Sequence, residues 1–412
     1  MVASPNDGYP KALAFRLAYF TILRWILKVH PSPDYGIMRP MKKIFWAIQN
    51  LDCIGGTETV SIQLMNLLCD TYEIHLICTS KQEGKSAYFI DPRIQIHNLE
   101  IPSEVGRFDQ CWAVYDGKGR RRLLKETLSS YVFHRNKTRK LIASWMDEDS
   151  IYIGSALDSY LLAPKHKHVY YHFHFDPENY LACPMQMVFR HCSKPEKIIF
   201  LAKHVKEEVL KKKKKKLAAK ATYIYNPAKF QPQKDIAFHG GKILFVGRFT
   251  EQKDPMLALE IAKLLHKDSV SFHLTMYGEG HLEQAMREFV QSNRLSEVSI
   301  ITGHSTTQED YFASDFLLCT STYEGWCLVK AEANACSRPV MTTHWDGPVE
   351  EVFDEKTDGW LMPSRDPKEF AKKIKEILSN PNQLLLQQEK AFEGSKRISN
   401  ESIKKAWVDL LG

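Results

Sequence analysis

Short apolar runs alternate with amphipathic segments along most of the chain, and this pattern predicts the secondary structure. In the first half, residues 60–70 predict an amphipathic helix, and short buried strands are expected at 42–48, 72–79, 150–156, 168–175 and 196–202. In the second half, helical stretches separate five further apolar runs, at 241–247, 271–278, 298–303, 315–321 and 339–343. Runs that are apolar throughout are typical of parallel strands covered on both faces. The pattern therefore predicts an α/β protein built from doubly wound, Rossmann-like units.

The chain is long enough for two such units. Its 412 residues exceed one ordinary domain, and residues 224–235 (IYNPAKFQPQKD) hold two prolines among polar residues, as a linker would. We therefore expect an N-terminal domain over 41–228, a C-terminal domain over 229–395, and a helix over 396–412 that packs back towards the N-terminal domain. The C-terminal ends of both sheets are expected to face a common cleft, since ligands bind at such edges.

Residues 1–40 precede the first predicted strand and have a different pattern. Positions 11–30 are apolar except for a few charges, and Arg16, Arg24 and Lys28 lie at multiples of four, which gives a helix with a narrow basic stripe. These charges disfavour a transmembrane span, and no small-residue cleavage site marks a signal peptide. An interfacial helix is the functional interpretation. The alternative is that translation starts at Met38 or Met41.

The positive charge is concentrated in one stretch. The net charge is +7, and residues 118–140 hold nine Lys or Arg against Glu126 alone, so this stretch contributes +8. Six lysines follow at 211–216. These runs are either solvated helix faces or a surface for an anionic membrane. With no nucleic-acid-binding signature, nucleic acid is not expected as a partner.

The cysteine pattern points to a reducing compartment. Nine cysteines are an odd number, no pair is spaced CxxC, and most lie in apolar runs. Buried free thiols of this kind favour a cytoplasmic protein over a disulfide framework. Together with the basic segments, this predicts a cytoplasmic location, with peripheral attachment at the inner face of the membrane as an extension.

Two cations follow the first strand of the C-terminal domain. In VGRFTEQKDP, Arg248 comes directly after the strand and Lys253 precedes Asp254 and Pro255, which suit the N-cap and first position of a helix. Arg248 and Lys253 therefore flank a strand-to-helix turn at the ligand-binding edge of the sheet. An arginine fork and a lysine point charge suit a diphosphate there, although ordinary loop cations would leave the same pattern.

Two glutamates flank another strand-to-helix turn of the same domain. Glu324 lies in the loop after the run at 315–321, and Glu332 lies about one turn inside the following helix, which begins near Cys327 or Leu328. The free N–H groups at this helix end favour a phosphate. Carboxylates accept hydrogen bonds from sugar or ribose hydroxyls, whereas the alternative interpretation of Glu332 is a solvated helix face.

The order of these motifs resembles the family 4 (group 1) retaining glycosyltransferases of GT-B fold. The resemblance rests on GGTET at 55–59, VGRFTEQKDP at 246–255, YGEGHLEQ at 277–284, ITGH at 301–304 and two glutamates with seven residues between them. It covers the whole C-terminal domain and, in the N-terminal domain, mainly residues 44–68 and the surroundings of His172. The glutamate spacing alone is weakly specific, whereas the ordered set is strongly specific.

The resemblance implies a role for each matching residue. Arg248 and Lys253 would bind the donor diphosphate together with Gly325, Cys327 and Leu328 of the helix end. Glu332 would bind the ribose, and Glu324 the hydroxyls of the donor sugar. Catalytic roles would fall to His172 and Glu324. Gly55 and Gly56 would let the first loop approach a phosphate or the acceptor.

Three positions depart from the family pattern. Trp326-Cys327 replaces a common Phe-Gly, which predicts a bulkier turn at the donor sugar. Ser337 stands where the helix often ends in glycine, so a left-handed conformation there would cost about 1 kcal/mol. Asp254 also replaces a common glycine.

A metal ion is not expected in the reaction. His172 and His174 share a strand face, but no third ligand has suitable spacing, and a core histidine or a polar residue facing the cleft are the alternatives. The acidic DED at 147–149 is interpreted as a turn at a helix end. Arg248, Lys253 and the helix end would neutralise the leaving diphosphate without metal.

The function implied is transfer of a hexosyl group from a nucleotide diphosphate sugar to a glycan or lipid-linked acceptor, as in envelope or capsular polysaccharide synthesis. Uridine diphosphate is expected as the donor nucleotide on frequency alone, and no cofactor beyond the donor substrate is expected. Retention without a recognisable nucleophile in the N-terminal domain favours attack on the leaving group's own face. The alternatives are a non-catalytic GT-B partner subunit, which would usually lose the cations or glutamates, and a GT-B nucleotide-sugar epimerase.

Overall fold

The structure, a computed structural model, describes residues 41–52, 55–80, 84, 86, 88–101, 135–174, 192–212, 219–324, 326–345 and 349–412. The chain divides at Met41, and the elements below all belong to Lys42–Gly412. The predicted helix at 11–30, the basic stretch up to residue 134 and Lys213–Lys216 lie outside the described residues.

The first sheet has seven parallel strands in the order β3-β2-β1-β4-β5-β6-β7. The strands are β1 (Lys43–Ile48), β2 (Glu73–Ser80), β3 (Gln95–Ile101), β4 (Ile151–Gly154), β5 (Val169–Phe173), β6 (Lys197–Phe200) and β7 (Ala221–Tyr223). Helices α2 (Gly56–Leu68), α5 (Leu157–Leu162) and α8 (Lys203–Lys212) connect some of them. The outward order from β1 in both directions is that of a doubly wound sheet.

The second sheet has six parallel strands in the order β10-β9-β8-β11-β12-β13. The strands are β8 (Lys242–Val246), β9 (His273–Tyr277), β10 (Val298–Ile301), β11 (Phe316–Cys319), β12 (Val340–Thr343) and β13 (Gly359–Met362). The helices are α10 (Pro255–Lys267), α11 (Glu283–Ser292), α12 (Gln308–Phe312), α13 (Leu328–Ala335), α14 (Val349–Val352), α15 (Pro367–Ser379) and α16 (Pro381–Ser395). The 3-10 turn η2 (Lys396–Ile398) leads into α17 (Asn400–Leu411).

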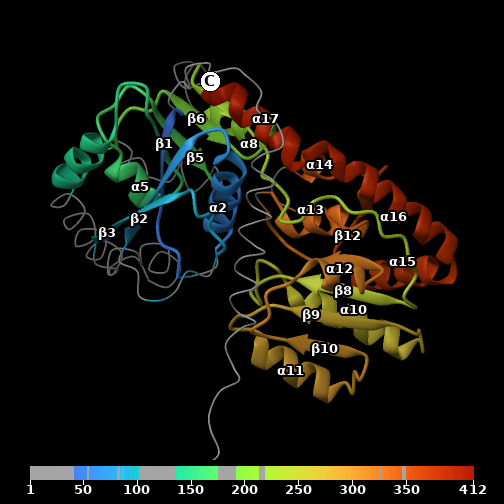
Figure 1. Cartoon of the computed structure of the whole chain (residues 1–412). Helices are drawn as coiled ribbons and strands as arrows, with labels where there is room; N and C mark the ends of the chain where they lie inside the picture. The colour runs from blue at the N-terminus through green and yellow to red at the C-terminus, as the bar shows by residue number, and fades with distance from the viewer. Residues whose placement is uncertain are drawn as a thin grey trace, which may run out of the picture. The chain divides into compact units, whose positions relative to one another are not determined.

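Both faces of each sheet are covered, because side chains of successive strand residues enter different cores. In β8, Ile243 and Phe245 pack with α10 and α15, whereas Leu244 belongs to the core that includes α13 (Figure 1). In β1, Trp46 packs with α2 and α17, whereas Phe45 belongs to the opposite core. The prediction of an α/β fold with two doubly wound units is confirmed.

The C-terminal helix α17 contacts the first sheet and α2. The Trp407 ring, which is fully buried, lies 5.1 Å from the Trp46 ring, centroid to centroid. Lys404 pairs with Asp70 at the end of α2, and Lys42 Nζ donates to the carbonyl of Leu411 at 2.7 Å. The last residues of the chain therefore complete the core of a sheet that begins more than 350 positions earlier.

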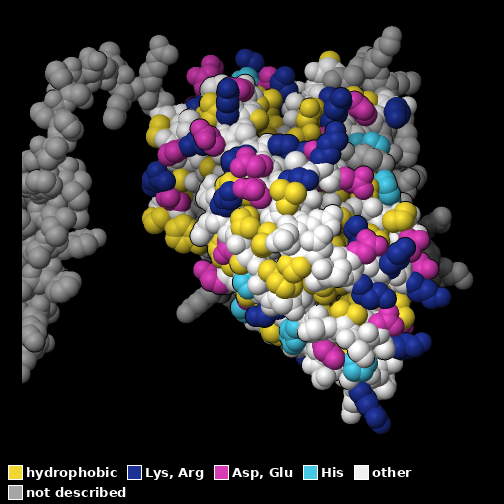
Figure 2. Space-filling model, turned by 90° about the vertical axis from the view of Figure 1, so that its right-hand side faces the viewer, with side chains coloured by type: hydrophobic (Ala, Val, Ile, Leu, Met, Phe, Trp, Pro, Cys, Tyr) yellow, Lys and Arg dark blue, Asp and Glu magenta, His cyan; other side chains and the backbone are white. Residues whose placement is uncertain are grey.

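Surface charge is mixed over the face of the second sheet's helices. Figure 2 shows Lys and Arg interspersed with Asp and Glu on this face, without a broad patch of one sign. Ion pairs on the helices of this domain include Lys375–Asp268 and Arg287–Glu283. Among the described residues, no helix combines the length and the apolar character that crossing a bilayer requires.

Candidate active site at the C-terminal edge of the second sheet

Two loops that leave neighbouring strands β8 and β11 are joined by hydrogen bonds. Gln252 accepts from Arg248 Nη2 at 3.1 Å and donates to the Tyr323 carbonyl at 3.1 Å. The Thr322 N–H donates to the Gln252 carbonyl at 2.8 Å. Arg248 is exposed, and its guanidinium lies at the carboxyl edge of a parallel sheet, where ligands of such folds bind.

The loop that carries Arg248 is also held by the end of β9. The Phe249 N–H donates to the Glu279 carbonyl at 2.8 Å, and Gly278 lies against the Gly247 carbonyl. A Cβ at Gly278 would lie 1.9 Å from that carbonyl oxygen, closer than any side chain tolerates. The glycine in YGEG is therefore required by the close approach of two backbones, and this approach fixes where the Arg248 loop begins.

Lys253 and Glu324 form a partly buried ion pair between the two loops. The Lys253 ammonium donates to Glu324 Oε1, which also accepts from the Ser321 hydroxyl at 2.6 Å. The side chains are 17% and 7% exposed. Burial disfavours the charged lysine, but the Glu324 carboxylate and neighbouring thiols outweigh it, so that the pKa of Lys253 is raised. The Lys253 ammonium thus stays charged at the sheet edge.

Asp254 caps α10 in a left-handed conformation with φ of 43°. Its carboxylate accepts from the Leu257 N–H at 3.1 Å and from Arg365 Nη2 at 2.5 Å. Arg365 also donates to the carbonyls of Thr320 and Ser321 at 2.8 and 3.0 Å. The N-cap role predicted for Asp254 is present, and its carboxylate also binds a third loop through Arg365. Sequence reasoning missed Arg365, because no motif places residue 365 beside residue 254.

The N-terminus of α13 has no side-chain cap. Cys327 is the N-cap residue in a left-handed conformation with φ of 57°, and its side chain makes no capping hydrogen bond. The first N–H groups of the helix, beginning at Leu328, are therefore free of side-chain capping and carry the positive end of the helix dipole. Gly325 lies outside the described residues. The Trp326 ring is buried and stacks on Tyr225 at 4.7 Å, centroid to centroid, so it belongs to the packing of the turn.

Glu332 lies inside α13, only 8% exposed, and is not on a solvated helix face. Its Oε2 accepts a hydrogen bond of 2.6 Å from the Tyr311 hydroxyl of α12. Burial raises the pKa of Glu332, and the Tyr311 bond together with Lys229 and Lys253 opposes the rise. Among the described residues, none donates a hydrogen bond to the second carboxylate oxygen of Glu332, Oε1. Sequence reasoning missed Tyr311, since nothing in QEDYF marks a partner of a residue 21 positions away.

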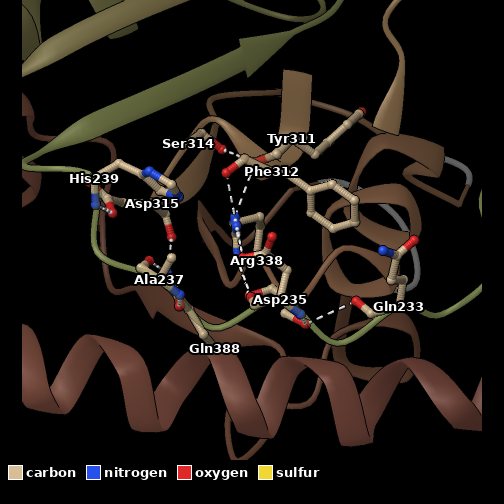
Figure 3. A network of polar contacts seen from close by, with 11 residues as sticks. Gln233, Asp235, Ala237, His239, Tyr311, Phe312, Ser314, Asp315, Arg338 and Gln388 are labelled. Carbon is tan, nitrogen blue, oxygen red and sulfur yellow. Dashed lines mark hydrogen bonds and ion pairs between the residues drawn. The ribbon is translucent and has the colours of Figure 1, made fainter. Parts of the chain in front are cut away.

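A buried arginine holds Tyr311 and the incoming linker together (Figure 3). Arg338 is fully buried, and its Nε donates to the Tyr311 carbonyl at 3.0 Å. Its terminal nitrogens donate to the Phe312 carbonyl at 2.9 Å and to the Asp235 carboxylate at 3.0 Å. Ser337, left-handed as expected with φ of 59°, accepts from the Asp235 N–H. The position of the Tyr311 hydroxyl is therefore set by a network that reaches the linker before β8.

Two thiols lie behind the Glu324 loop. Cys319 at the end of β11 and Cys327 are both buried, and their sulfurs are 3.8 Å apart. The Cys327 hydrogen bond lowers the pKa of Cys319 to about 7, and the same contact raises the pKa of Cys327. With Glu324 they form the one cluster of at least three His, Cys, Asp or Glu ligand atoms within 4.8 Å of each other in the described part of the chain.

His172 lies in the core of the first sheet. Its side chain is 1% exposed and contacts the rings of Trp46 and Trp407 edge-on. Nδ1 is 3.0 Å from His174 Nε2, whereas Nε2 has no hydrogen-bond partner among the described residues. Burial lowers the pKa of His172 well below its usual value and that of His174 to about 3, so both rings are neutral near pH 7. The recorded contacts of His172 join it to α17, and none joins it to the loops of the second sheet.

Gly55 and Gly56 begin α2 at the edge of the first sheet. The Gly55 N–H donates to the Tyr88 hydroxyl at 3.0 Å, and a Cβ at Gly55 would lie 2.3 Å from Glu58 Oε2. At Gly56 a Cβ would meet no atom within 4 Å. A side chain at Gly55 would require the Glu58 carboxylate to move, and the space around Gly56 does not explain why that residue is glycine.

Arg248, Lys253, Glu324, the start of α13 and Glu332 therefore come from one edge of one sheet. Their loops are joined by hydrogen bonds, and they combine two cations, an uncapped helix end and two carboxylates. Such an edge binds an anion beside a hydroxyl-bearing group.

Comparison with known proteins finds a matching family model and several relatives. Residues 228–394 match the model of the Glycosyl transferases group 1. An uncharacterized glycosyltransferase of Methanocaldococcus jannaschii is 29% identical over 224 residues, which cover 52% of this chain and 60% of that protein. The amylovoran biosynthesis glycosyltransferase AmsD of Erwinia amylovora is 23% identical over 382 residues, 90% of this chain and all of that protein.

Solved structures share the fold of the whole described chain. A TarM mutant of S. aureus, in complex with fondaparinux, alpha-GlcNAc-glycerol and UDP, superposes with a TM-score of 0.69 at 17% identity, over 90% of this chain and 100% of that one. HepE of Anabaena, in complex with UDP and glucose, gives a TM-score of 0.66 at 13% identity, over 90% and 99%. At these identities the likeness concerns the fold.

Proposed function

We propose that this chain, whose residues 228–394 match the Glycosyl transferases group 1 model, is a retaining hexosyltransferase of GT-B fold that uses a nucleotide diphosphate sugar. Its acceptor is a glycan or a lipid-linked glycan in the synthesis of a cell-envelope or capsular polysaccharide, and its favoured donor nucleotide is UDP. The donor occupies the edge of the second sheet.

One observation carries this proposal: the Lys253–Glu324 pair lies between two hydrogen-bonded loops, beside exposed Arg248 and the uncapped end of α13. The cations and the helix end suit the two phosphates of the donor. Glu324 is positioned by Lys253 and Ser321 to accept from sugar hydroxyls, and Glu332 accepts from the ribose. A phosphate that approaches Lys253 competes with Glu324 for the ammonium, which leaves the glutamate free for the sugar.

The reaction needs stabilisation of the charge on the leaving diphosphate. As the glycosidic bond breaks, negative charge grows on the phosphate oxygen, and preorganised cations bind that charge more tightly than they bind the intact donor. Arg248, Lys253 and the α13 N–H groups supply this effect. We favour attack by the acceptor on the face that the diphosphate leaves, with the leaving phosphate taking the acceptor's proton, which preserves the anomeric configuration. The predicted catalytic role of His172 then requires it to act from its buried site.

The relatives support the choice of donor and pathway class. AmsD is named for amylovoran biosynthesis, and a relative in Campylobacter jejuni is named as a galactosaminyltransferase acting on an undecaprenol-linked saccharide. The TarM and HepE complexes both contain UDP. A lipid-linked acceptor would also give the basic segments of this chain a membrane surface to bind.

The donor site is tested by nucleotide-dependent stabilisation against unfolding. UDP, GDP, ADP and CMP are compared in the presence of a chelator, for the wild type, Arg248→Ala and Arg287→Ala. Arg248 is the better test than Lys253, because it is exposed and its loss leaves no buried carboxylate unpaired. Arg287 is the matched control, an exposed arginine of α11 that pairs with Glu283.

A nucleotide at 100-fold excess over its Kd is expected to add about 2.7 kcal/mol to the free energy of unfolding. We expect this for UDP with the wild type and Arg287→Ala, and a clearly smaller gain with Arg248→Ala. If no nucleotide stabilises the wild type, or if Arg248→Ala and the wild type respond alike, the donor site is not at this edge.

Membrane attachment is proposed for the basic segments and has its own test. Liposomes that contain anionic lipid are expected to bind the whole chain more strongly than a variant that lacks residues 1–37 and carries neutral side chains at Arg120, Arg121 and Arg122. Equal binding of both proteins, or equal binding to neutral liposomes, would exclude an electrostatic role for these segments.

A further inference from the structure

The thiol pair behind the Glu324 loop has the geometry of a metal site. Cys319 ends β11 and Cys327 begins α13, so the two sulfurs lie at the two ends of the loop that carries Glu324. Both cysteines and Glu324 are buried, and a ligand atom from each lies within 4.8 Å of the other two. The loop thus brings a soft S₂ pair and one carboxylate to a single point.

The distance between the sulfurs matches that of two ligands on one tetrahedral metal ion. Two thiolates bound to zinc at about 2.3 Å, with a tetrahedral angle near 109.5°, lie about 3.8 Å apart. The sulfurs of Cys319 and Cys327 are 3.8 Å apart, whereas a disulfide requires about 2.05 Å. The two sulfurs therefore lie at the spacing that a tetrahedral metal uses, and they are not bonded to each other.

We propose that Cys319, Cys327 and Glu324 bind a thiophilic divalent cation of the zinc type. Calcium and magnesium prefer oxygen ligands, so the sulfurs select against them. Binding releases the proton of each thiol, and two thiolates with one carboxylate carry three negative charges. The cation and the adjacent Lys253 ammonium together carry three positive charges, so the occupied site is neutral. Water completes the tetrahedron.

Occupation of this site would block the donor, and this part rests on the proposed function. The cation binds the Glu324 carboxylate that the donor sugar needs. The cation and the Lys253 ammonium repel each other only until both thiols have lost their protons. It also ties Cys327, the N-cap of α13, to the strand end at Cys319. The metal is therefore an inhibitor of donor binding and has no part in the transfer reaction.

The site is tested by titration of the freshly reduced whole protein with Co²⁺ under anaerobic conditions, since cobalt–thiolate bonds absorb in the near ultraviolet. The wild type is compared with Cys319→Ala and Cys336→Ala, and Zn²⁺ is then added to displace the cobalt. Cys336 is the matched control, because it is a fully buried thiol at the other end of α13 and lies outside the cluster. Glu324→Gln keeps both thiols and removes the carboxylate.

We expect one equivalent of tightly bound Co²⁺ with thiolate absorption in the wild type and in Cys336→Ala. Cys319→Ala should lose more than the roughly 10- to 100-fold affinity that outer-shell partners contribute to metal sites. Glu324→Gln should keep the absorption and bind more weakly. Absence of thiolate absorption in the wild type, or equal affinity in Cys319→Ala, would overturn the proposal.

A separate measurement covers the link to the donor. UDP stabilisation of the wild type should disappear with one equivalent of Zn²⁺ and return with chelator, whereas Cys319→Ala should respond to UDP in both conditions. If UDP never stabilises the protein, the proposed function fails and the cobalt titration still decides the metal site. If UDP and one bound Zn²⁺ are accommodated together, the inhibitory part is wrong.

Discussion

Removal of the Tyr311 hydroxyl tests whether Glu332 is held as a charged, oriented carboxylate. In Tyr311→Phe the ring stays, and Glu332 loses the 2.6 Å hydrogen bond to Oε2. Tyr311 is fully buried and Glu332 is 8% exposed, so water has little access to replace the hydroxyl. The ring should remain in place, because Arg338 holds the Tyr311 backbone carbonyl rather than the hydroxyl.

The expected loss follows from the charge and the burial of this bond. A hydrogen bond to a charged group contributes about 1.5–3 kcal/mol. The pKa of Glu332 is already raised by burial, and the Tyr311 bond is the largest effect opposing that rise. Without this bond the effect of burial is opposed less, so the substitution should raise the pKa of Glu332 further.

The sign of the pH dependence is fixed by the direction of the shift. A carboxyl group with a raised pKa in the folded state favours folding at low pH, and this contribution is lost as the pH rises through the folded pKa. Tyr311→Phe should therefore destabilise the protein more at a pH at which Glu332 is ionised than at a pH below its pKa. The pH below which UDP affinity falls should move upward, since the ribose needs the carboxylate.

Urea unfolding and UDP calorimetry between pH 5 and 8 measure both effects. Tyr277→Phe is the matched control, because it removes another phenol–carboxylate bond of the same domain, the 3.0 Å contact with Asp310. If Tyr311→Phe has the stability and the pH profile of the wild type, Tyr311 does not hold Glu332. A loss of stability that is the same at every pH would show a packing defect without an effect on the carboxylate.

Three further substitutions test the fold by denaturant unfolding. Gly278→Ala should destabilise the protein by several kcal/mol or prevent folding, because its Cβ would lie 1.9 Å from the Gly247 carbonyl oxygen. A loss of stability below about 0.5 kcal/mol, which is typical of surface changes, would contradict the close approach of the two backbones. Ser269→Gly should stabilise by up to about 1 kcal/mol, since Ser269 is left-handed and exposed after α10, and a loss would show an unrecognised role. Trp407→Ala should cost about 3–5 kcal/mol through the cavity beside Trp46, unless α17 contributes little to the first core.

The sequence was most informative about strands whose faces are both buried. The runs at 42–48 and 241–247 predicted β1 and β8 within a residue or two, because every position after the initial lysine of each strand is apolar. Strand β3 was missed: its side chains lie at an edge and are largely exposed, so QIHNLEI has no apolar run. Strands β7 (Ala221–Tyr223) and β13 (Gly359–Met362) were also missed.

The candidate site was predictable where the chain itself sets the geometry. Asp254 before Pro255 is a local capping signal, and the structure has that cap. Glu324 follows a strand, and its place at the sheet edge follows from the parallel topology. The pairing of Lys253 with Glu324 was not predictable, since 71 residues separate them and only the order β8-β11 makes them neighbours.

Contacts made by the end of the chain were the hardest to foresee in detail. His172 lies against Trp407, which is more than 200 positions away, so the burial of the ring depends on a helix beyond the second sheet. A sequence pattern of alternating His and aromatic residues is equally compatible with a strand facing solvent. Its proposed catalytic role stays a prediction.

The most direct test of the central claim is the anomeric configuration of sugar released from a nucleotide sugar without acceptor. NMR spectra of the whole protein with UDP-hexoses and chelator should show slow release of UDP and of free hexose that first appears with the donor's anomeric configuration. Arg248→Ala should release much less than Arg287→Ala. First appearance of the inverted anomer would contradict retention, and no release from any donor, with no protection by UDP, would contradict the donor site itself.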